Sequence, residues 1–182
     1  MKQILDDASQ FLVNGQVILY PTDTIWGLGC DATNAEAISK IYEIKQRPSS
    51  KNFIIFFPNL EMLSEYLSYP MDLSFFEANS EPTTYIIQQK MKLPSALIAA
   101  DNSTAVRIPK NELCIQLMLK IGKPIVSTSA NISGEPSPNS YGDIDIKVKK
   151  SVDFIVPESY FVGTGIASKI KICKNNNWET LR

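Results

Sequence analysis

The chain has no histidine among its 182 residues, so it lacks the side chain that enzymes most often use as an acid or base near neutral pH. Its three cysteines, Cys30, Cys114 and Cys173, are far apart and fit no zinc or redox spacing, so we expect buried thiols. Catalysis is therefore expected to rest on cations, hydroxyl groups and backbone amides that position a substrate and stabilise its charge.

An excess of one charge and long apolar runs are also missing. Eighteen Lys and Arg residues stand against nineteen Asp and Glu residues, so the chain lacks the overall basic character of a dedicated nucleic-acid-binding protein. No apolar run approaches the roughly 20 residues of a membrane span, and polar residues interrupt any signal-peptide core near the start. We expect one compact domain over residues 1–182, located in the cytoplasm, with no membrane partner.

Helix-like and strand-like segments alternate along the chain, which predicts an α/β fold with a mixed, twisted sheet. The apolar spacing predicts helices at residues 2–14, 33–45, 59–67 and 111–121. Short apolar or branched runs predict strands at residues 16–20, 53–57, 83–87, 104–108, 124–127, 153–156 and 168–173.

Two local signals place the ends of the second helix. Thr33 and Glu36 form a T-x-x-E capping box, which predicts where this helix begins. Pro48 disfavours helical geometry at Arg47, so we expect Lys45 and Arg47 in or just after the last turn. These cations either complement the helix dipole or neutralise phosphates, with Arg47 as a bidentate fork and Lys45 as a point charge.

A second polar cluster follows the predicted strand at 124–127. Ser127, Ser129 and Asn131 alternate along an extended segment, an arrangement that would send all three side chains to one face. Turn formation alone explains such residues, but their hydroxyl and amide groups also suit phosphate, a ribose or the amino group of a small substrate. The chain has neither a P-loop nor a Gly-x-Gly-x-x-Gly pattern, so any nucleotide is held in another way.

Arg107 lies in the apolar segment 105–109. It is either an exposed edge residue or a buried cation that needs an anionic partner, such as a small carboxylate substrate. Thr22, Asp23 and Thr24 follow a predicted strand, where open α/β sheets commonly bind ligands. They form either a simple turn or a site in which Asp23 helps to hold a divalent cation through water.

Four segments resemble the motifs of the YrdC-like family of threonylcarbamoyl-AMP synthases. They are residues 20–32 (YPTDTIWGLGCDA), Lys45-x-Arg47-Pro48, residues 105–109 (AVRIP) and residues 127–134 (STSANISG). The resemblance extends over nearly the whole chain. The length of the chain resembles that of the short, single-domain members of the family. It implies an open, twisted mixed sheet with surrounding helices and a large, positively charged cavity.

The resemblance also implies an activity. L-Threonine, bicarbonate or carbon dioxide, and ATP would give threonylcarbamoyl-AMP and pyrophosphate, with Mg²⁺ implied by the use of ATP. A downstream threonylcarbamoyl transferase complex would then complete the N6-threonylcarbamoyladenosine modification of tRNA. The alternative is a YrdC-like protein that binds a nucleotide or double-stranded RNA without synthase activity. Carbamoyl transfer in hydrogenase maturation is disfavoured, because the other portions of those larger proteins are absent.

Matching motifs assign roles to individual residues, although no metal ligand follows from them. The expected threonine contacts are Thr24, Arg107, which would bind the carboxylate, Ser127 and Ser168. The expected ATP contacts are Arg47, Lys51, Ser103 or its neighbour Thr104, Ser129, Ser137 and Arg182. The expected catalytic quartet is Lys45, Arg47, Ser129 and Asn131. Phe56 stands where some members place a threonine-contacting histidine.

Overall fold

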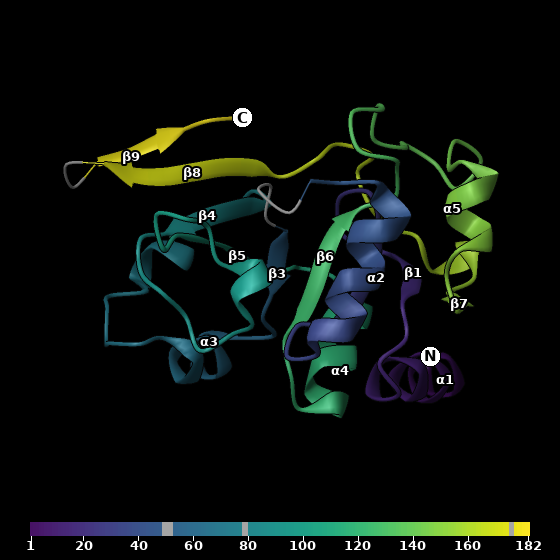
Figure 1. The fold of residues 1–182 in the computed structure, drawn as a ribbon, viewed down its shortest axis with the longest axis horizontal. Coiled ribbons are helices and arrows are strands. Elements are labelled where there is room, and N and C mark those ends of the chain that lie inside the picture. Colours follow the sequence, from purple (N-terminus) through teal and green to yellow (C-terminus); the bar gives the residue numbers. More distant parts are fainter. Residues whose placement is uncertain (49–52, 78–79, 175–176) are drawn as a thin grey trace.

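The computed structural model describes residues 1–48, 53–77, 80–174 and 177–182. In this part of the chain, nine strands form one mixed sheet in the order β7-β1-β2-β6-β3-β5-β4-β8-β9 (Figure 1). The strands are β1 (Ile18–Pro21), β2 (Trp26–Asp31), β3 (Ile54–Phe56), β4 (Thr83–Ile87), β5 (Thr104–Arg107), β6 (Ile125–Ser129), β7 (Phe154–Ile155), β8 (Lys169–Lys174) and β9 (Asn177–Thr180). The pairs β1–β7, β3–β5 and β4–β8 are parallel and the others antiparallel, which confirms the predicted mixed α/β sheet.

Helices connect and cover the strands. The α-helices of the described residues are α1 (Lys2–Val13), α2 (Ala35–Lys45), α3 (Leu60–Tyr66), α4 (Glu112–Ile121) and α5 (Ile146–Lys150). Short 3-10 turns lie at Ser74–Phe76, Ser95–Leu97 and Glu158–Tyr160. Helix α4 illustrates how local sequence fixes the boundaries: the Asn111 side chain accepts a hydrogen bond from the Cys114 amide at the start, and Gly122 takes a left-handed conformation, φ 66°, at the end.

The predicted capping box at the start of α2 is wrong by one residue. Asn34 is the N-cap, and its side-chain oxygen accepts hydrogen bonds from the amides of Glu36 and Ala37, each 3.0 Å long. The Thr33 hydroxyl instead donates to Asp31 Oδ1 over 2.7 Å. Asn and Thr are both good N-caps, so the sequence pattern could not choose between adjacent candidates. The other end agrees with the prediction, since α2 ends at Lys45 and Gln46 is left-handed.

Helices lie on both faces of the sheet. On one face, Ala37, Ile38 and Ile41 of α2 pack in a cluster with Ile55 and Val126. On the other, α1 and α4 pack against Ile18, Phe56 and Ile125, as part of a second cluster. Ile55 and Phe56 are consecutive, as are Ile125 and Val126, because successive side chains of a strand point to opposite faces. The result is a three-layer arrangement.

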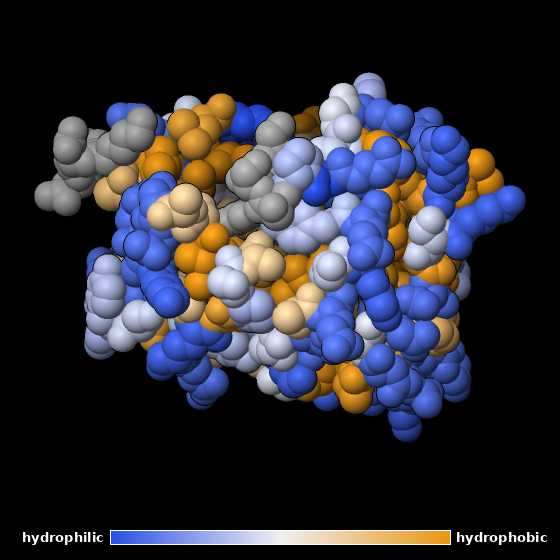
Figure 2. All heavy atoms as spheres, viewed as in Figure 1, coloured by the Kyte–Doolittle hydropathy of each residue, from blue (hydrophilic) through white to orange (hydrophobic). Residues whose placement is uncertain are grey.

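Three elements were not predicted: β2, α5 and β9. Strand β6 also extends two residues beyond the predicted end at Ser127, so that Ser129 lies in the strand rather than in a turn after it. The β8–β9 hairpin projects from the body (Figure 1), and Trp178 packs on Phe75 and Tyr85, with ring centroids 4.5 and 4.9 Å apart. Hydrophobic side chains gather around this hairpin in Figure 2. Within the described ranges, no helix is both long and apolar enough to cross a membrane.

Candidate active site

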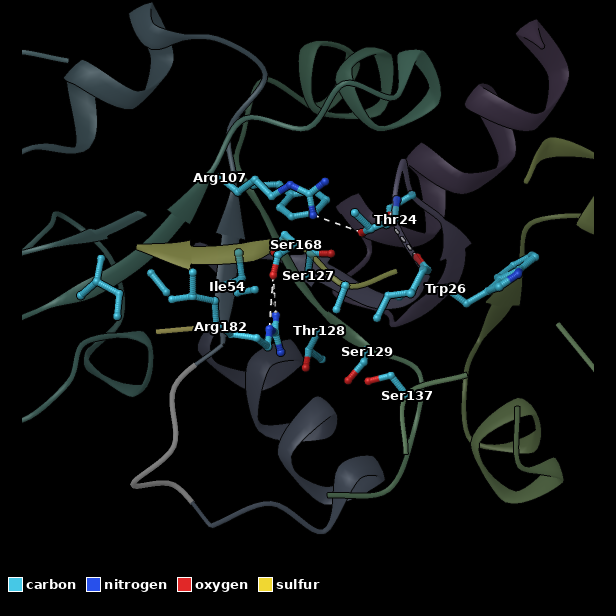
Figure 3. A pocket seen from close by; sticks show the side chains of 18 of the residues that line it. Thr24, Trp26, Ile54, Arg107, Ser127, Thr128, Ser129, Ser137, Ser168 and Arg182 are labelled. Atoms are coloured by element: carbon cyan, nitrogen blue, oxygen red, sulfur yellow. Dashed lines mark hydrogen bonds between the residues drawn. The ribbon is translucent and has the colours of Figure 1, made fainter. Parts of the chain in front are cut away.

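A cavity of about 220 Å³ lies on the sheet face that α1 and α4 partly cover (Figure 3). Ile125 on β6 packs against Leu117 of α4, but Ser127, two residues further on the same face, lines the cavity. Part of the floor is one row of cross-strand partners, Ser127, Ile54, Ala105 and Ile86. Ser127 and Ala105 have small side chains, and the helices do not cover the sheet at this position, so space remains for the cavity.

Arg107 stands at the end of β5, with its guanidinium group in this cavity and only 2% of the residue exposed. Its Nη1 donates a hydrogen bond of 3.1 Å to Thr24 Oγ1, and its Nη2 lies 2.6 Å from Asp23 Oδ1, without the alignment of a hydrogen bond. The Phe56 ring lies 5.3 Å from the guanidinium carbon. Nε of Arg107 has no hydrogen-bond partner among the described residues. Arg107 is therefore the buried cation of the two predicted possibilities, and Asp23 supplies an anionic partner from within the chain.

The loop after β1 holds this arginine. Thr22 Oγ1 donates to the carbonyl of Ile25 over 2.7 Å and accepts a hydrogen bond from the Thr24 amide. The second carboxylate oxygen of Asp23 accepts a hydrogen bond of 3.0 Å from the Lys110 amide. Asp23 is thus engaged by an ion pair and a backbone donor, and the suggestion that it serves a divalent cation gains no support from this geometry. Among the described residues, no group of three or more His, Cys, Asp or Glu side chains is placed to hold a metal ion.

Residues 163–165, which no sequence pattern indicated, pack against the loop that holds Arg107. The amides of Thr164 and Gly165 donate hydrogen bonds to the carbonyls of Asp23 and Thr24, over 3.4 and 2.8 Å. A Cβ atom on Gly163 would lie 2.6 Å from the Thr24 carbonyl oxygen and 2.7 Å from that of Thr22. The close approach of two loops therefore requires glycine at this position. Only the contact between distant segments identifies this role.

Ser127 and Ser168 lie beside Arg107. Both are almost fully buried and line the cavity, and the Ser168 hydroxyl shares a 2.9 Å hydrogen bond with Thr84. All four predicted threonine contacts, Thr24, Arg107, Ser127 and Ser168, are therefore brought together at the cavity. Three of them come from different motifs, so the fold brings together residues that are far apart in the sequence.

The predicted nucleotide contacts differ in whether they line the cavity. Arg47, Ser129, Ser137 and Arg182 all line the cavity. Figure 3 shows Ser129 and Ser137 away from Arg107 and Thr24, with Arg182 between the two groups. Arg182 donates from Nε and Nη2 to the carbonyl of Ser168, over 3.2 and 3.1 Å. Ser103 is nearly buried after the turn at Asp101 and is not among the lining residues, and Lys51 lies outside the described residues.

Arg47 and Lys45 occupy different places although only one residue separates them. The Arg47 guanidinium lines the cavity and lies over the Phe53 ring, 5.2 Å from its centroid, and burial lowers its pKa. Lys45 is 1% exposed and, like Asn131, is not among the lining residues. Its ammonium group donates to Ser129 and Asn131. The four members of the predicted quartet are thus gathered together, with Arg47 and Ser129 at the cavity.

The cysteines take no part in this site. Cys30 and Cys114 are buried, as expected, and burial raises the pKa of both thiols. Cys173 is only partly buried, which contradicts the expectation for this residue. It lies on β8, an outer strand paired with the terminal hairpin strand β9, where little of the core reaches it.

Known proteins share both the sequence pattern and the fold. The threonylcarbamoyl-AMP synthase of Enterobacter sp. (strain 638) is 37% identical over 134 residues, which cover 71% of this chain and 70% of that protein. The structure of P. abyssi Sua5 complexed with L-threonine matches with a TM-score of 0.86 and 26% identity, over 98% of this chain and 53% of that one. This chain therefore spans about half of that Sua5. E. coli YciO matches with a TM-score of 0.80 and 25% identity, over 100% of this chain and 89% of that one.

The family pattern includes all four motifs and extends beyond them toward both ends of the chain. The pattern of the Sua5/YciO/YrdC family, which carries the description "Telomere recombination", matches residues 10–182. The resemblance drawn from the sequence is confirmed, and so is the open mixed sheet that it implied. The chain belongs to the Sua5/YciO/YrdC family.

Proposed function

We propose that the chain is an L-threonylcarbamoyladenylate synthase, which makes threonylcarbamoyl-AMP and pyrophosphate from L-threonine, bicarbonate or carbon dioxide, and ATP. One observation carries the proposal: a single cavity is lined by the buried Arg107, by a second arginine, Arg47, and by Ser129 and Ser137, which Figure 3 shows away from Arg107. Relatives named threonylcarbamoyl-AMP synthase, 32–37% identical over most of the chain, support the same activity.

Threonine would bind at the Arg107 end. Arg107 lines the cavity, and a carboxylate is the partner that best compensates a buried guanidinium. Its Nε has no partner among the described residues but is closed to solvent, so the side chain would turn toward the bound carboxylate. The hydroxyls of Thr24 and Ser127 lie beside it, suited to the polar groups of the amino acid. The cavity, about 220 Å³, is smaller than the ~300–1,000 Å³ of typical ligand pockets, so the amino acid would lie inside and the nucleotide would extend through the mouth.

ATP would lie along the other end. Arg47 would place its planar guanidinium on phosphate oxygens, and Ser137 would donate a hydrogen bond. The Ser129 hydroxyl donates to Asn131 Oδ1 in this structure, so it would turn its single O–H to the nucleotide when ATP binds. Arg182, held to the Ser168 carbonyl, would add positive charge between the two substrates. The site has no histidine or reactive thiol to attack the nucleotide, so the nucleophile would come from the substrates themselves.

The reaction then needs positioning and charge stabilisation. The amine of threonine combines with carbon dioxide and loses a proton, which gives a carbamate. A carbamate oxygen attacks the α-phosphorus, the new P–O bond forms, and the bond to pyrophosphate breaks. Negative charge grows on the transferring group and on pyrophosphate, where the Arg47 guanidinium and the serine hydroxyls would stabilise it.

Magnesium enters this proposal only with the nucleotide. The described residues provide no cluster of metal ligands, and Asp23 is engaged by Arg107 and the Lys110 amide. Mg²⁺ commonly binds substrate phosphates with few protein ligands, so we propose that it arrives bound to ATP. We further propose the downstream transferase complex and tRNA as partners, and the cytoplasm as the place of action.

Incubation of the purified chain with ATP, Mg²⁺, bicarbonate and labelled threonine tests the proposal. We expect labelled threonylcarbamoyl-AMP and pyrophosphate in equal amounts, both dependent on bicarbonate. Valine has nearly the shape of threonine without the hydroxyl, so it provides a control for the hydroxyl contacts of the site. If folded protein gives no product above the reaction without protein, the synthase proposal is wrong. Steeply salt-dependent binding of double-stranded RNA in that case would favour the RNA-binding alternative.

A further inference from the structure

Lys45, the last residue of α2, is 1% exposed and makes three hydrogen bonds across the chain. Its Nζ donates to the carbonyl oxygen of Ser129 over 2.5 Å, to that of Asn131 over 2.8 Å, and to Asn131 Oδ1 over 3.1 Å. An ammonium group has three N–H bonds. All three are directed to the segment 129–131.

Further hydrogen bonds hold the segment 129–131 in place. Ser129 Oγ donates to Asn131 Oδ1 over 2.6 Å, and Asn131 Nδ2 donates to the Glu135 carbonyl over 2.6 Å. The Ser133 amide donates a hydrogen bond of 2.8 Å to the Lys45 carbonyl. The end of α2 and the end of β6 are thereby joined by side-chain and backbone hydrogen bonds. Of Lys45, Ser129 and Asn131, only Ser129 lines the cavity.

We propose that Lys45 is a positioning residue, which fixes the segment 129–131 so that the Ser129 hydroxyl faces the nucleotide. It does not contact the phosphates, because its three donors are used behind the cavity wall. What the segment binds rests on the proposed function, whereas the hydrogen-bonded arrangement does not. The cation that meets the phosphates is Arg47, two residues later, which lines the cavity.

The protonation of Lys45 gives a direct measure of this role. Burial, and next the positive charge of Arg47, lower its pKa from 10.5 to about 7. Arg47 is the charged side chain that acts on Lys45 within the described part of the chain, and the facing segment 129–131 contributes only neutral groups. A neutral amine has two N–H bonds and a lone pair, so it cannot donate to three oxygen atoms. The hold on residues 129–131 should therefore weaken as the pH rises through about 7.

A titration of the nucleotide-free protein tests the hydrogen-bonded arrangement. We expect the NMR amide signals of Asn131 and Ser133 to shift with a midpoint near pH 7. Histidine, the usual source of such a midpoint, is absent from the chain, and the Met1 amino group lies elsewhere, beside Tyr160. In Lys45→Met, the titration should disappear and both amides should exchange with solvent about tenfold faster or more. The absence of a titration in the unaltered protein would overturn the proposal, even if Lys45→Met fails to fold.

A double-mutant cycle tests whether Lys45 acts through Ser129. If it does, Lys45→Met should lower kcat about tenfold in the original chain and less than about threefold when Ser129→Ala is already present. Lys40→Met is the matched control, because Lys40 lies on the same helix and donates to the Gly15 carbonyl rather than to the segment 129–131; it should leave kcat unchanged. Equal, multiplicative losses from Lys45→Met and Ser129→Ala would indicate an independent phosphate contact and overturn the proposal. Without activity in the original chain the synthase proposal fails, and the titration still decides the role of Lys45.

Discussion

Arg107 and Lys45 are both almost fully buried cations next to the same cavity, yet they are used in different ways. Arg107 faces the cavity, shares an ion pair with Asp23 and keeps an unpartnered Nε. Lys45 stands behind the wall and directs its three N–H bonds to backbone and amide oxygens of the protein. Burial alone therefore does not identify a substrate-binding cation; its position at the cavity does.

Replacement of Arg107 should give the largest effect. Arg107→Ala leaves Asp23 without its cation, and we expect a loss of about 3 kcal/mol in unfolding free energy, at the low end for a buried pair because Asp23 keeps some exposure. Threonine affinity should fall more than ATP affinity, as measured by calorimetric titration with each substrate. Lys169→Ala breaks the exposed pair with Glu81 and should change the unfolding free energy far less, because solvent screens this pair. Equal losses for both substrates would contradict a carboxylate site at Arg107.

Arg47 is the third cation of this region, and it lines the cavity. Arg47→Ala should lower kcat by about 100-fold or more, because it removes one preorganised group that stabilises the developing charge. Steady-state rates of pyrophosphate release measure this effect, with Lys40→Ala on α2 as the control. An unchanged kcat would mean that Arg47 is only a cation near the end of a helix and takes no part in the reaction.

Gly163, which lies against the loop of Thr22 and Thr24, allows a change at the threonine end of the cavity to be compared with the nucleotide end. Gly163→Ala places a methyl group against the Thr22 and Thr24 carbonyls, so we expect a stability loss of about 1–3 kcal/mol and a higher KM for threonine. The matched control is Gly142→Ala, whose new Cβ would lie 3.6 Å from Ser140 Oγ, at ordinary contact distance. Urea unfolding and substrate titration measure both changes. If KM for ATP rises instead, this loop does not belong to the threonine end.

The pH dependence of stability tests the buried state of Lys45. Lys45 has a pKa of about 7 in the folded protein and an ordinary value of 10.5, so between these values the folded state binds fewer protons than the unfolded state. Its contribution to unfolding free energy therefore rises with pH above 7, by at most ~1.4 kcal/mol per pH unit, and is flat below about pH 6. Urea unfolding from pH 6 to 9 should show this rise in the original chain and less of it in Lys45→Met. Parallel curves would contradict the lowered pKa.

Local signals predicted much of the fold. Helices α1 and α4 and strand β4 agree with the expected ranges to within a residue or so, because apolar spacing, the residue Asn111 and the glycines after each helix act within a few positions. Strand β2 escaped detection because Gly27 and Gly29 interrupt its strand-like character. A Cβ on Gly29 would lie 2.6 Å from the Tyr20 ring, so this glycine is required by a neighbouring strand.

The residues of the site were predictable, but their division of roles was not. Ser127 and Ser129 both line the cavity, but so does Thr128 between them, so alternation does not explain which residues of β6 reach it, and Asn131 lies beyond the strand and is bound by Lys45. The pairing of Arg107 with Asp23 joins positions far apart in the chain, and no local pattern contains that information. The same holds for Gly163, whose importance depends on how two loops approach.

The strand order also has a consequence for the synthesis of the chain. Strand β6, residues 125–129, lies between β2 and β3, both of which the ribosome completes much earlier. Until β6 emerges, β2 and β3 each present an unpaired edge, the type of surface that promotes association between incomplete chains. We therefore expect the sheet to close late and slowly, since its central pairings join distant parts of the sequence. The strand that carries Ser127 and Ser129 therefore completes the middle of the sheet, whereas the site also needs Ser168 and Arg182, which are synthesised later, so the site is complete only after the end of the chain has folded.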